Sequence, residues 1–262
     1  MISVLMCTYQ SASTLERACR SILDGSYKDL ELIVVDDGST DFTPAVLDQL
    51  AFDPRLRAVR LEQNMGLTHG LNLALAEAKG EYIARMDADD VSHPDRLSKE
   101  LTYLEAHPEL GYVSCAVNLV EDRTIWGERH FPDRPTMDDL MHGNPYVHPG
   151  MLLRKAVLDK VNGYRDIPQT VRCEDYDLVL RLKAEGIDGG NLPEVLLDYT
   201  ERRDSSARHT RTSRLNECWV RRQAAKYLHW GPKGKLLAYK PLLLGMLPKS
   251  LYNRLHRGKW AK

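Results

Sequence analysis

The sequence predicts an α/β fold in which helices flank a mostly parallel β-sheet. Through the first hundred of its 262 residues, short apolar runs alternate with segments of helical periodicity. The apolar runs are bounded by Gly, Asp and Asn, which is typical of buried strands. Polar side chains follow these runs directly, at the carboxyl ends where parallel sheets bind ligands. The alternating order therefore predicts a twisted sheet with a site along one rim.

Four strands are expected in this region, and each is followed by a helix. The strands cover residues 2–7, 30–35, 56–61 and 81–86. The helices cover residues 13–25, 43–50, 65–78 and 94–107. A capping sequence at Ser13 and the closing Gly25 set the bounds of the first helix, and Pro94 and Pro108 bound the fourth.

The second half of the chain has weaker patterns. A strand is expected at 110–120, a helix at 174–185 and a short strand at 195–199. Residues 121–150 are rich in Pro and His with little periodicity, which indicates loops around a pocket. Beyond residue 205 the pattern is helical and basic.

Charge is unevenly distributed, although the net charge is only −1. Residues 202–262 carry sixteen Lys and Arg against two acids, whereas residues 1–201 carry 35 acids and 20 bases. We therefore expect a domain over 1–206 and a helical, basic C-terminal extension over 207–262.

Leucines accompany the basic residues of this extension. They include Leu236, Leu237, Leu242, Leu243, Leu244, Leu247, Leu251 and Leu255. Basic amphipathic helices of this kind bind anionic membrane surfaces, so a membrane surface is one expected partner. The alternative is that the leucines pack on the domain and the basic residues are merely solvated.

The five cysteines and the N-terminus indicate a cytoplasmic protein. An odd number of cysteines without Cys-x-x-Cys spacing argues against a disulfide framework or a zinc site. The apolar start is too short for a signal sequence, and no apolar run approaches the roughly 20 residues that span a bilayer. The expected location is the cytoplasm, or peripherally the inner face of the plasma membrane.

Three carboxylates, Asp87, Asp89 and Asp90, lie at the exit of the fourth strand. They repel one another unless a cation or hydrogen-bond donors offset their charge. Magnesium and manganese sites use one or two carboxylates together with substrate phosphate oxygens. The segment therefore suggests a divalent metal that carries a diphosphate, although a solvated acidic turn would also explain it in isolation.

Five segments in a fixed order carry a family resemblance. They are Cys7-Thr8-Tyr9, Asp36-Asp37-Gly38-Ser39, Asn64-Met65-Gly66, Met86-Asp87-Ala88-Asp89-Asp90 and Cys173-Glu174-Asp175-Tyr176. Together they closely resemble glycosyltransferase family 2, the inverting enzymes that use nucleotide sugars. The resemblance implies a GT-A-like, Rossmann-like domain with a nucleotide-binding half over 1–110 and an acceptor half over 111–206. The signature of the processive polysaccharide synthases, Gln-x-x-Arg-Trp, is missing, so transfer of one sugar is expected.

The resemblance implies roles for the residues of the nucleotide-binding half. Asp37 would accept a hydrogen bond from the base, most often uracil, because a carboxylate is a pure acceptor. Thr8 and Tyr9 would line the base, and Asn64 would contact the nucleotide. Asp87 would hold the ribose or take part in the metal site.

The metal and the acceptor half are assigned on the same resemblance. Asp89 would bind Mn²⁺ or Mg²⁺ together with Asp87, while Asp90 would cap or orient. Asp175 would be the general base and Glu174 would hold the acceptor, although acids at a helix start also complement its dipole. His148 would touch the acceptor or diphosphate, or be structural.

The expected function is a metal-dependent transfer of one sugar from a nucleotide sugar, with UDP as the expected carrier, to a glycan or lipid-linked acceptor in bacterial surface polysaccharide synthesis. A dinucleotide-binding oxidoreductase would need Gly-x-Gly-x-x-Gly after the first strand, where this chain has Cys7-Thr8-Tyr9-Gln10. A non-catalytic carbohydrate- or nucleic-acid-binding module that uses the basic extension is the alternative. It leaves the acids of the rim unexplained, so no nucleic-acid partner is expected.

Overall fold

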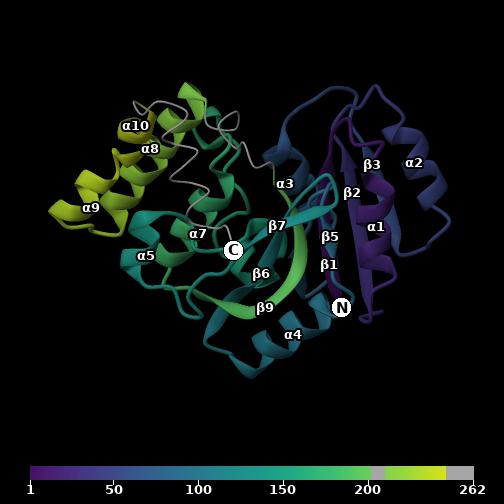
Figure 1. Cartoon of the computed structure of the whole chain (residues 1–262), viewed down its shortest axis with the longest axis horizontal. Helices are drawn as coiled ribbons and strands as arrows, with labels where there is room; N and C mark the ends of the chain where they lie inside the picture. The colour runs from purple at the N-terminus through teal and green to yellow at the C-terminus, as the bar shows by residue number, and fades with distance from the viewer. Residues whose placement is uncertain (202–209, 246–262) are drawn as a thin grey trace.

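The computed structural model describes residues 1–201 and 210–245. A curved sheet of nine strands runs through these residues, with helices on both faces (Figure 1). Two clusters of buried apolar side chains lie on its two sides, and each holds helices against the strands. The predicted α/β class is confirmed.

The first four strands are the parallel strands that the sequence predicts. They are β1 (Ile2–Thr8), β2 (Leu30–Asp36), β3 (Leu56–Arg60) and β4 (Tyr82–Arg85). Their order is β3-β2-β1-β4, and all three neighbouring pairs are parallel. Every residue of β1 and β4 is buried, which explains why both strands are mostly apolar.

Helices of the first half divide between the two faces. They are α1 (Leu15–Leu23), α2 (Thr43–Leu50), α3 (Leu67–Glu77) and α4 (Arg96–Ala106). Side chains of α1, α2 and α4 share one apolar cluster, whereas those of α3 belong to the other. Both faces of the parallel strands are therefore covered, as such strands require.

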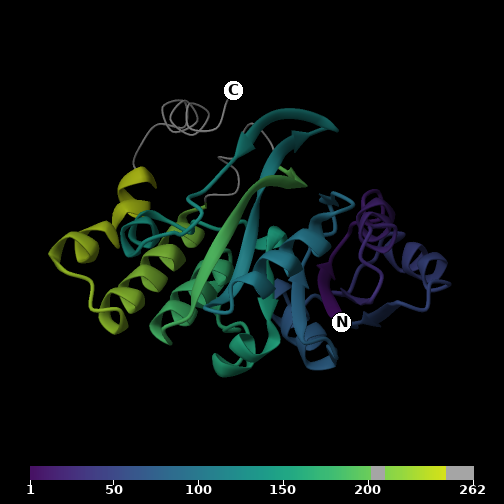
Figure 2. The same cartoon turned by 90° about the horizontal axis from the view of Figure 1, so that it is seen from below.

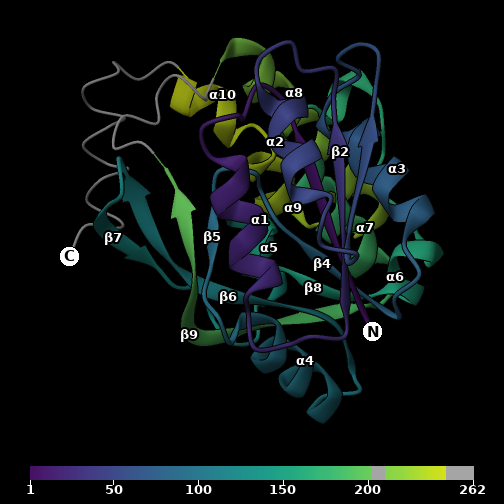
Figure 3. The same ribbon diagram turned by 90° about the vertical axis from the view of Figure 1, so that its right-hand side faces the viewer.

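The second half of the sheet mixes parallel and antiparallel pairs. Its strands are β5 (Val91–Ser92), β6 (Leu110–Glu121), β7 (Thr124–Arg129), β8 (Leu152–Arg154) and β9 (Asp188–Thr200). β8 is antiparallel to both β4 and β6, and so joins the two halves. The long β9 runs parallel to β6 and bends so that its end pairs with β5 (Figure 3).

Two expectations for this half need correction. Residues 121–150 are not all loop, because β7 forms a hairpin with β6 (Figure 2) and a helix, α5 (Met137–His142), follows. The last strand begins at Asp188 rather than near residue 195. Its first residues include Gly189, whose absent side chain leaves room for the Tyr112 ring: a Cβ there would lie 2.0 Å from a ring carbon. Glycine is weak as a strand signal, so the pattern missed this segment.

Helices complete the C-terminal side of the molecule. They are α6 (Lys155–Lys160), α7 (Glu174–Ala184), α8 (Arg211–Tyr227), α9 (Pro232–Leu237) and α10 (Lys240–Gly245), with short 3-10 turns η1 (His148–Gly150) and η2 (Pro168–Thr170). Figure 1 places α8, α9 and α10 on the side away from α1 and α2. α8 contributes Val220 and Ala224 to the same apolar cluster as α7, so it packs on the core of the domain.

Part of the basic extension can be compared with its prediction. Helices form over 211–245 as expected, while Leu247, Leu251, Leu255 and the proposed boundary at 206/207 lie outside the described residues. Leu236 and Leu243 are 72% and 61% exposed. Across residues 1–201 and 210–245, no helix is long and apolar enough to cross a membrane. All five cysteines are free and buried.

Candidate active site

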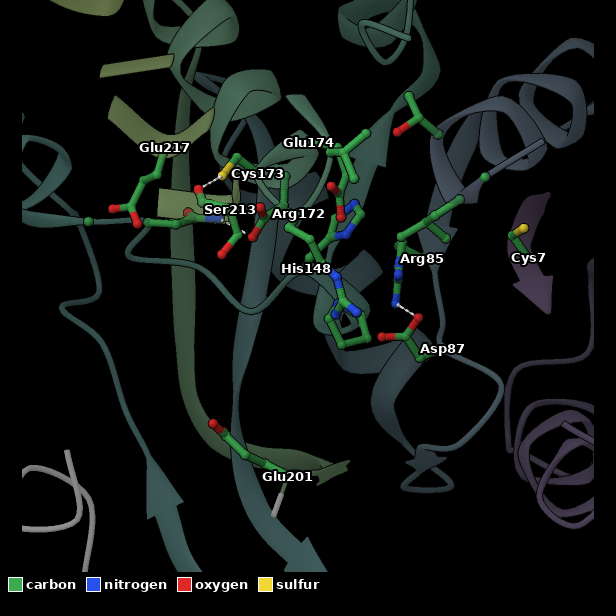
Figure 4. A pocket seen from close by; sticks show the side chains of 18 of the residues that line it. Cys7, Arg85, Asp87, His148, Arg172, Cys173, Glu174, Glu201, Ser213 and Glu217 are labelled. Carbon is green, nitrogen blue, oxygen red and sulfur yellow. Dashed lines mark hydrogen bonds and ion pairs between the residues drawn. The ribbon is translucent and has the colours of Figure 1, made fainter. Parts of the chain in front are cut away.

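One pocket of about 1020 Å³ opens at the carboxyl ends of the parallel strands. All nine residues that the sequence singles out for the site line it: Thr8, Tyr9, Asp37, Asn64, Asp87, Asp89, His148, Glu174 and Asp175. They come from segments up to 167 positions apart, which the sheet brings to one rim. Figure 4 shows part of this lining, with Asp87 on one side and Glu174 on the other.

Asp37 is held by the loop that follows β3. Its side chain is 2% exposed, and its two oxygens accept hydrogen bonds from the backbone N–H groups of Met65 (2.7 Å) and Gly66 (2.9 Å). The turn after Asp37 needs Gly38, which has φ +74°, because a Cβ there would lie 2.5 Å from the Gln63 carbonyl carbon. A carboxylate has about four lone-pair directions, so Asp37 keeps acceptor capacity toward the pocket.

Thr8 and Tyr9 end β1 in contrasting environments. Thr8 is buried, and its hydroxyl has no hydrogen-bond partner among the described residues although it lines the pocket. The Tyr9 side chain is 48% exposed, so its ring is not used in ordinary core packing. Asn64 is exposed on the loop that Asp37 fixes. These residues form an open face beside a buried acceptor, which suits a planar ring with N–H donors.

The acidic segment after β4 forms a compact cluster. Oxygens of Asp87, Asp89 and Asp90 lie within 4.8 Å of one another. Asp90 is fully buried and its Oδ1 accepts the backbone N–H of Thr200 at 2.7 Å, whereas its Oδ2 has no hydrogen-bond partner within the described part of the chain. Burial, then the charges of Asp87 and Asp89, raise the pKa of Asp90 well above its usual value.

The composition of this cluster fits a divalent cation. Its ligand atoms are carboxylate oxygens, which Mg²⁺ and Mn²⁺ prefer. A cation would also offset the repulsion among these three neighbouring carboxylates. Asp90 is engaged by the N–H of Thr200. Asp87 and Asp89 are both partly exposed and are the accessible carboxylates.

Arg85, the last residue of β4, is a pocket residue that the sequence reading missed. Its side chain is 3% exposed, and Nη1 lies 2.5 Å from Oδ1 of Asp87. Burial opposes its charge, but Asp87 raises the pKa of Arg85 above its ordinary value. One signal could have revealed it: a single arginine interrupts the apolar run Tyr82-Ile83-Ala84-Arg85-Met86. A buried charge in such a strand usually has a specific partner.

Glu174 and Asp175 open α7 on the opposite side of the pocket. Oδ2 of Asp175 accepts a hydrogen bond from Nδ2 of Asn144 at 2.9 Å. Burial raises the pKa of Asp175, and the Asn144 bond opposes this shift. Burial and the neighbouring Asp175 charge raise the pKa of Glu174 to about 7. Carboxyl groups tuned upward in this way are typical of general acid–base sites.

His148 lies between these two sides of the pocket. It is buried, and its Nε2 is 2.8 Å from the Tyr164 hydroxyl. Burial, and then the charge of Arg85, hold the pKa of His148 well below its usual value. This shift favours the neutral imidazole. Tyr164 is fixed in turn by Asn72, which bonds its backbone N–H and C=O at 2.9 and 2.8 Å.

The C-terminal helices also line the pocket, which the sequence reading did not foresee. Arg214 and Glu217 of α8 and Lys240 of α10 are among its lining residues. Asn144, which lies before η1, is a further lining residue that the sequence did not predict. The expected extension is therefore part of the pocket wall. Little in the sequence indicates this role, because a basic amphipathic pattern predicts a solvated or membrane-binding helix.

Comparisons with known proteins identify the family of the chain. The sequence model of "Glycosyl transferase family 2" matches residues 3–161. "Putative glycosyltransferase EpsE" of Bacillus subtilis is 34% identical over 258 residues, covering 98% of this chain and 93% of that protein. "O-antigen biosynthesis glycosyltransferase WbnJ" of Escherichia coli is 33% identical over 76% of this chain and 79% of its own. "Amylovoran biosynthesis glycosyltransferase AmsE" of Erwinia amylovora is 31% identical over 75% of each.

Solved structures share the fold at lower sequence identity. S. aureus TarS 1–349 in complex with UDP-GlcNAc superimposes with a TM-score of 0.72 at 19% identity, covering 92% of this chain and 70% of that one. The mannosyltransferase PcManGT from Pyrobaculum calidifontis in complex with GDP-Man and Mn²⁺ gives a TM-score of 0.66 at 23% identity, covering 98% and 75%.

Proposed function

The chain belongs to glycosyltransferase family 2, and on this premise we propose that it transfers one sugar from a UDP-sugar to an acceptor hydroxyl with inversion. The observation that carries the proposal is the pocket itself. The pocket has an acidic cluster and the open face beside Asp37 on one side, and a carboxyl pair with raised pKa values on the other. A donor can bind across the first side while an acceptor enters from the second.

The donor base is assigned to Asp37, Thr8, Tyr9 and Asn64. Asp37 is a fixed, buried acceptor, which suits the imide N–H of uracil. Stacking on the exposed Tyr9 ring would add about 1–3 kcal/mol, the usual range for a base on an aromatic ring. The complex of TarS with UDP-GlcNAc supports a uridine carrier, whereas that of PcManGT with GDP-Man shows that a related fold accepts guanosine.

Asp89 and Asp87 are assigned to a divalent metal, Mn²⁺ or Mg²⁺. The Mn²⁺ complex of PcManGT supports this choice for a similar fold. When bound there, a divalent cation supplies positive charge that stabilises the departing diphosphate. Asp87 also pairs with Arg85, so it can contact the ribose only through the oxygen that this ion pair leaves accessible.

Asp175 is assigned as the general base. It would accept the proton of the acceptor hydroxyl while that oxygen attacks the anomeric carbon from the face opposite the diphosphate. The Asn144 bond fixes its orientation and favours its ionised form. Glu174 would hold a second acceptor hydroxyl. The neutral His148, oriented by Tyr164, would complete the acceptor contacts without adding charge.

The acceptor is proposed to be a glycan or lipid-linked sugar of a bacterial surface polysaccharide. The names of WbnJ and AmsE, which concern O-antigen and amylovoran biosynthesis, support this setting. Arg172, Arg214 and Lys240 line the acceptor side of the pocket. Their positive charges would suit an acceptor that carries phosphate, such as a lipid diphosphate.

We also propose that the protein is cytoplasmic and binds peripherally to the inner face of the plasma membrane. Leu236, Tyr239 and Leu243 of α9–α10 are 72%, 44% and 61% exposed, beside Lys233 and Lys235. Each basic residue near an anionic surface contributes about 1 kcal/mol. Sedimentation with anionic and neutral vesicles tests this: equal recovery in the supernatant with both, at low salt, would contradict it.

The activity is tested with a panel of UDP-sugars and GDP-mannose, with and without Mn²⁺. Released nucleoside diphosphate is measured first, because slow donor hydrolysis needs no acceptor. Products of any transfer are then analysed by NMR for anomeric configuration. Metal-dependent release from a UDP-sugar and an inverted product are expected. Retention of configuration, or failure of every nucleotide sugar to bind, would refute the proposal.

A further inference from the structure

Arg85 is a buried cation whose hydrogen-bonding capacity is only partly used. Its side chain is 3% exposed and forms one ion pair, with Asp87. Nη1 is engaged by Asp87, but among the described residues Nε has no hydrogen-bond partner, although the side chain lines the pocket. Leaving a charged N–H group unsatisfied in a buried site is costly. The arrangement therefore points to an acceptor atom on a ligand.

The backbone of Arg85 is fixed on both sides. Its N–H donates to the Met151 carbonyl at 2.9 Å, and its C=O accepts from Nη2 of Arg96 at 2.7 Å. Arg96 is itself fully buried and paired with Glu100 at 3.1 Å. A side chain anchored on a rigid strand end is suited to recognition, because little order has to be gained on binding.

Arg85 lies between the two functional sides of the pocket. Figure 4 shows its guanidinium directed at Asp87, with His148 and Glu174 close by. After burial, the charge of Arg85 is among the causes that move the pKa values of His148, Glu174 and Asp175. One guanidinium is thus near both the proposed diphosphate–metal site and the proposed base.

The role that this position indicates for Arg85 rests on the proposed function. In a single displacement the transferred sugar must lie between the general base and the departing diphosphate. We propose that Arg85 forms the floor of the donor-sugar subsite and donates hydrogen bonds to hydroxyl or ring oxygens of the transferred sugar. The ligand class is a neutral hydroxylated sugar, because Asp87, Glu174 and Asp175 already surround the guanidinium with negative charge and would repel a carboxylate.

The test compares UDP with a complete donor. The Ki of UDP and the kcat/KM for hydrolysis of the UDP-sugar that wild type turns over are measured with Mn²⁺ in wild type, Arg85→Lys and Arg85→Met. Arg85→Lys keeps a charge for Asp87 but lacks the guanidinium fork. Arg154→Met is the matched control: this arginine lies on the neighbouring β8, is held by the carbonyls of Leu104 and Leu110, and does not line the pocket.

In Arg85→Lys, kcat/KM is expected to fall by about 10–100-fold, the value of one or two hydrogen bonds from a charged donor, while the Ki of UDP stays unchanged. Arg154→Met should alter neither. Equal losses in the affinity for UDP and in donor turnover would assign Arg85 to the diphosphate and overturn the proposal. Full turnover by Arg85→Lys, or wild-type preference for UDP-glucuronate over UDP-glucose, would also overturn it. Failure of wild type to bind UDP would instead refute the proposed function.

Discussion

The two sides of the pocket hold their carboxylates in different ways. On the nucleotide side Asp37 is fixed by backbone N–H groups of Met65 and Gly66, so its position follows directly from the fold. On the acceptor side Asp175 accepts a hydrogen bond from a side chain, Asn144, of a distant loop, in addition to backbone bonds at the start of α7. Backbone contacts give a rigid recognition surface, whereas a side-chain contact can tune the protonation of a single group. The nucleotide side is therefore expected to control binding, and the acceptor side to control turnover and its pH dependence.

The largest effect is expected at the acidic cluster. Asp89→Ala should abolish metal-dependent nucleotide binding and lower turnover by about 10³-fold or more, because the diphosphate charge loses its counter-ion. Excess chelator should do the same to wild type. Asp95→Ala, which removes an exposed acid at the start of α4, is the control. Turnover by Asp89→Ala at the wild-type rate would contradict the assignment of the metal to Asp89 on the nucleotide side.

Asp175→Asn should lower kcat by roughly 10²–10⁴-fold, as expected for the loss of a general base. The KM for the donor should hardly change, since the nucleotide contacts are on the other side. Asp159→Asn, an exposed acid of α6 paired with Lys155, controls for the loss of one negative charge. A large rise in donor KM with unchanged kcat would mean that Asp175 binds the donor instead.

Asn144→Ala tests the role of Asp175 as general base through the pH dependence of turnover. The Asn144 hydrogen bond lowers the pKa of Asp175 against the effect of burial, so its loss should raise that pKa. The base is then protonated over a wider acidic range, and turnover should fall by roughly three- to tenfold at pH 6 and by less at pH 8. Asn118→Ala removes a comparable bond, to Asp198 at 2.7 Å, outside the pocket. A loss independent of pH would show that Asn144 acts only in packing.

Glu174→Gln should have the smallest effect, and this effect is a gain in the free energy of unfolding rather than a loss of turnover. Because the folded pKa of Glu174 is raised to about 7 from a usual 4.5, ionising it opposes folding as pH rises between these values. The variant should gain about 1–3 kcal/mol of unfolding free energy at pH 8 and almost none at pH 4.5. Urea titrations at both pH values measure this, with the exposed Glu185→Gln as control. A gain of equal size at both pH values would exclude the titration of Glu174 as its cause.

The sequence predicted the nucleotide side more closely than the acceptor side. Strands β1 and β2 are mostly apolar runs with polar residues at their ends, so both the elements and Asp37 could be located. β8 has three residues and β5 only two; segments this short show no periodicity. The first residues of β9 include two glycines, of which Gly189 makes room for the Tyr112 ring. Such elements are set by tertiary packing, which a local pattern does not record.

The site follows the same division. Its acidic residues were identified because they lie in short motifs with fixed spacing. Arg85 and Asn144 were missed because their roles arise from contacts with Asp87 and Asp175, which are formed only in the folded chain. The part of the wall formed by α8 was missed for another reason. Its charge suggested a separate extension, while its apolar face packs beside α7.

Calorimetric titration of UDP in the presence of Mn²⁺ tests most directly whether nucleotide binding and proton transfer belong to different sides of the pocket. It should be run on wild type, Asp89→Ala and Asp175→Asn under identical conditions. Wild type and Asp175→Asn should bind UDP with equal affinity, while Asp89→Ala should show no binding that depends on the metal. Loss of UDP binding in Asp175→Asn, or its retention in Asp89→Ala, would contradict the assignment of binding to one side of the pocket and proton transfer to the other.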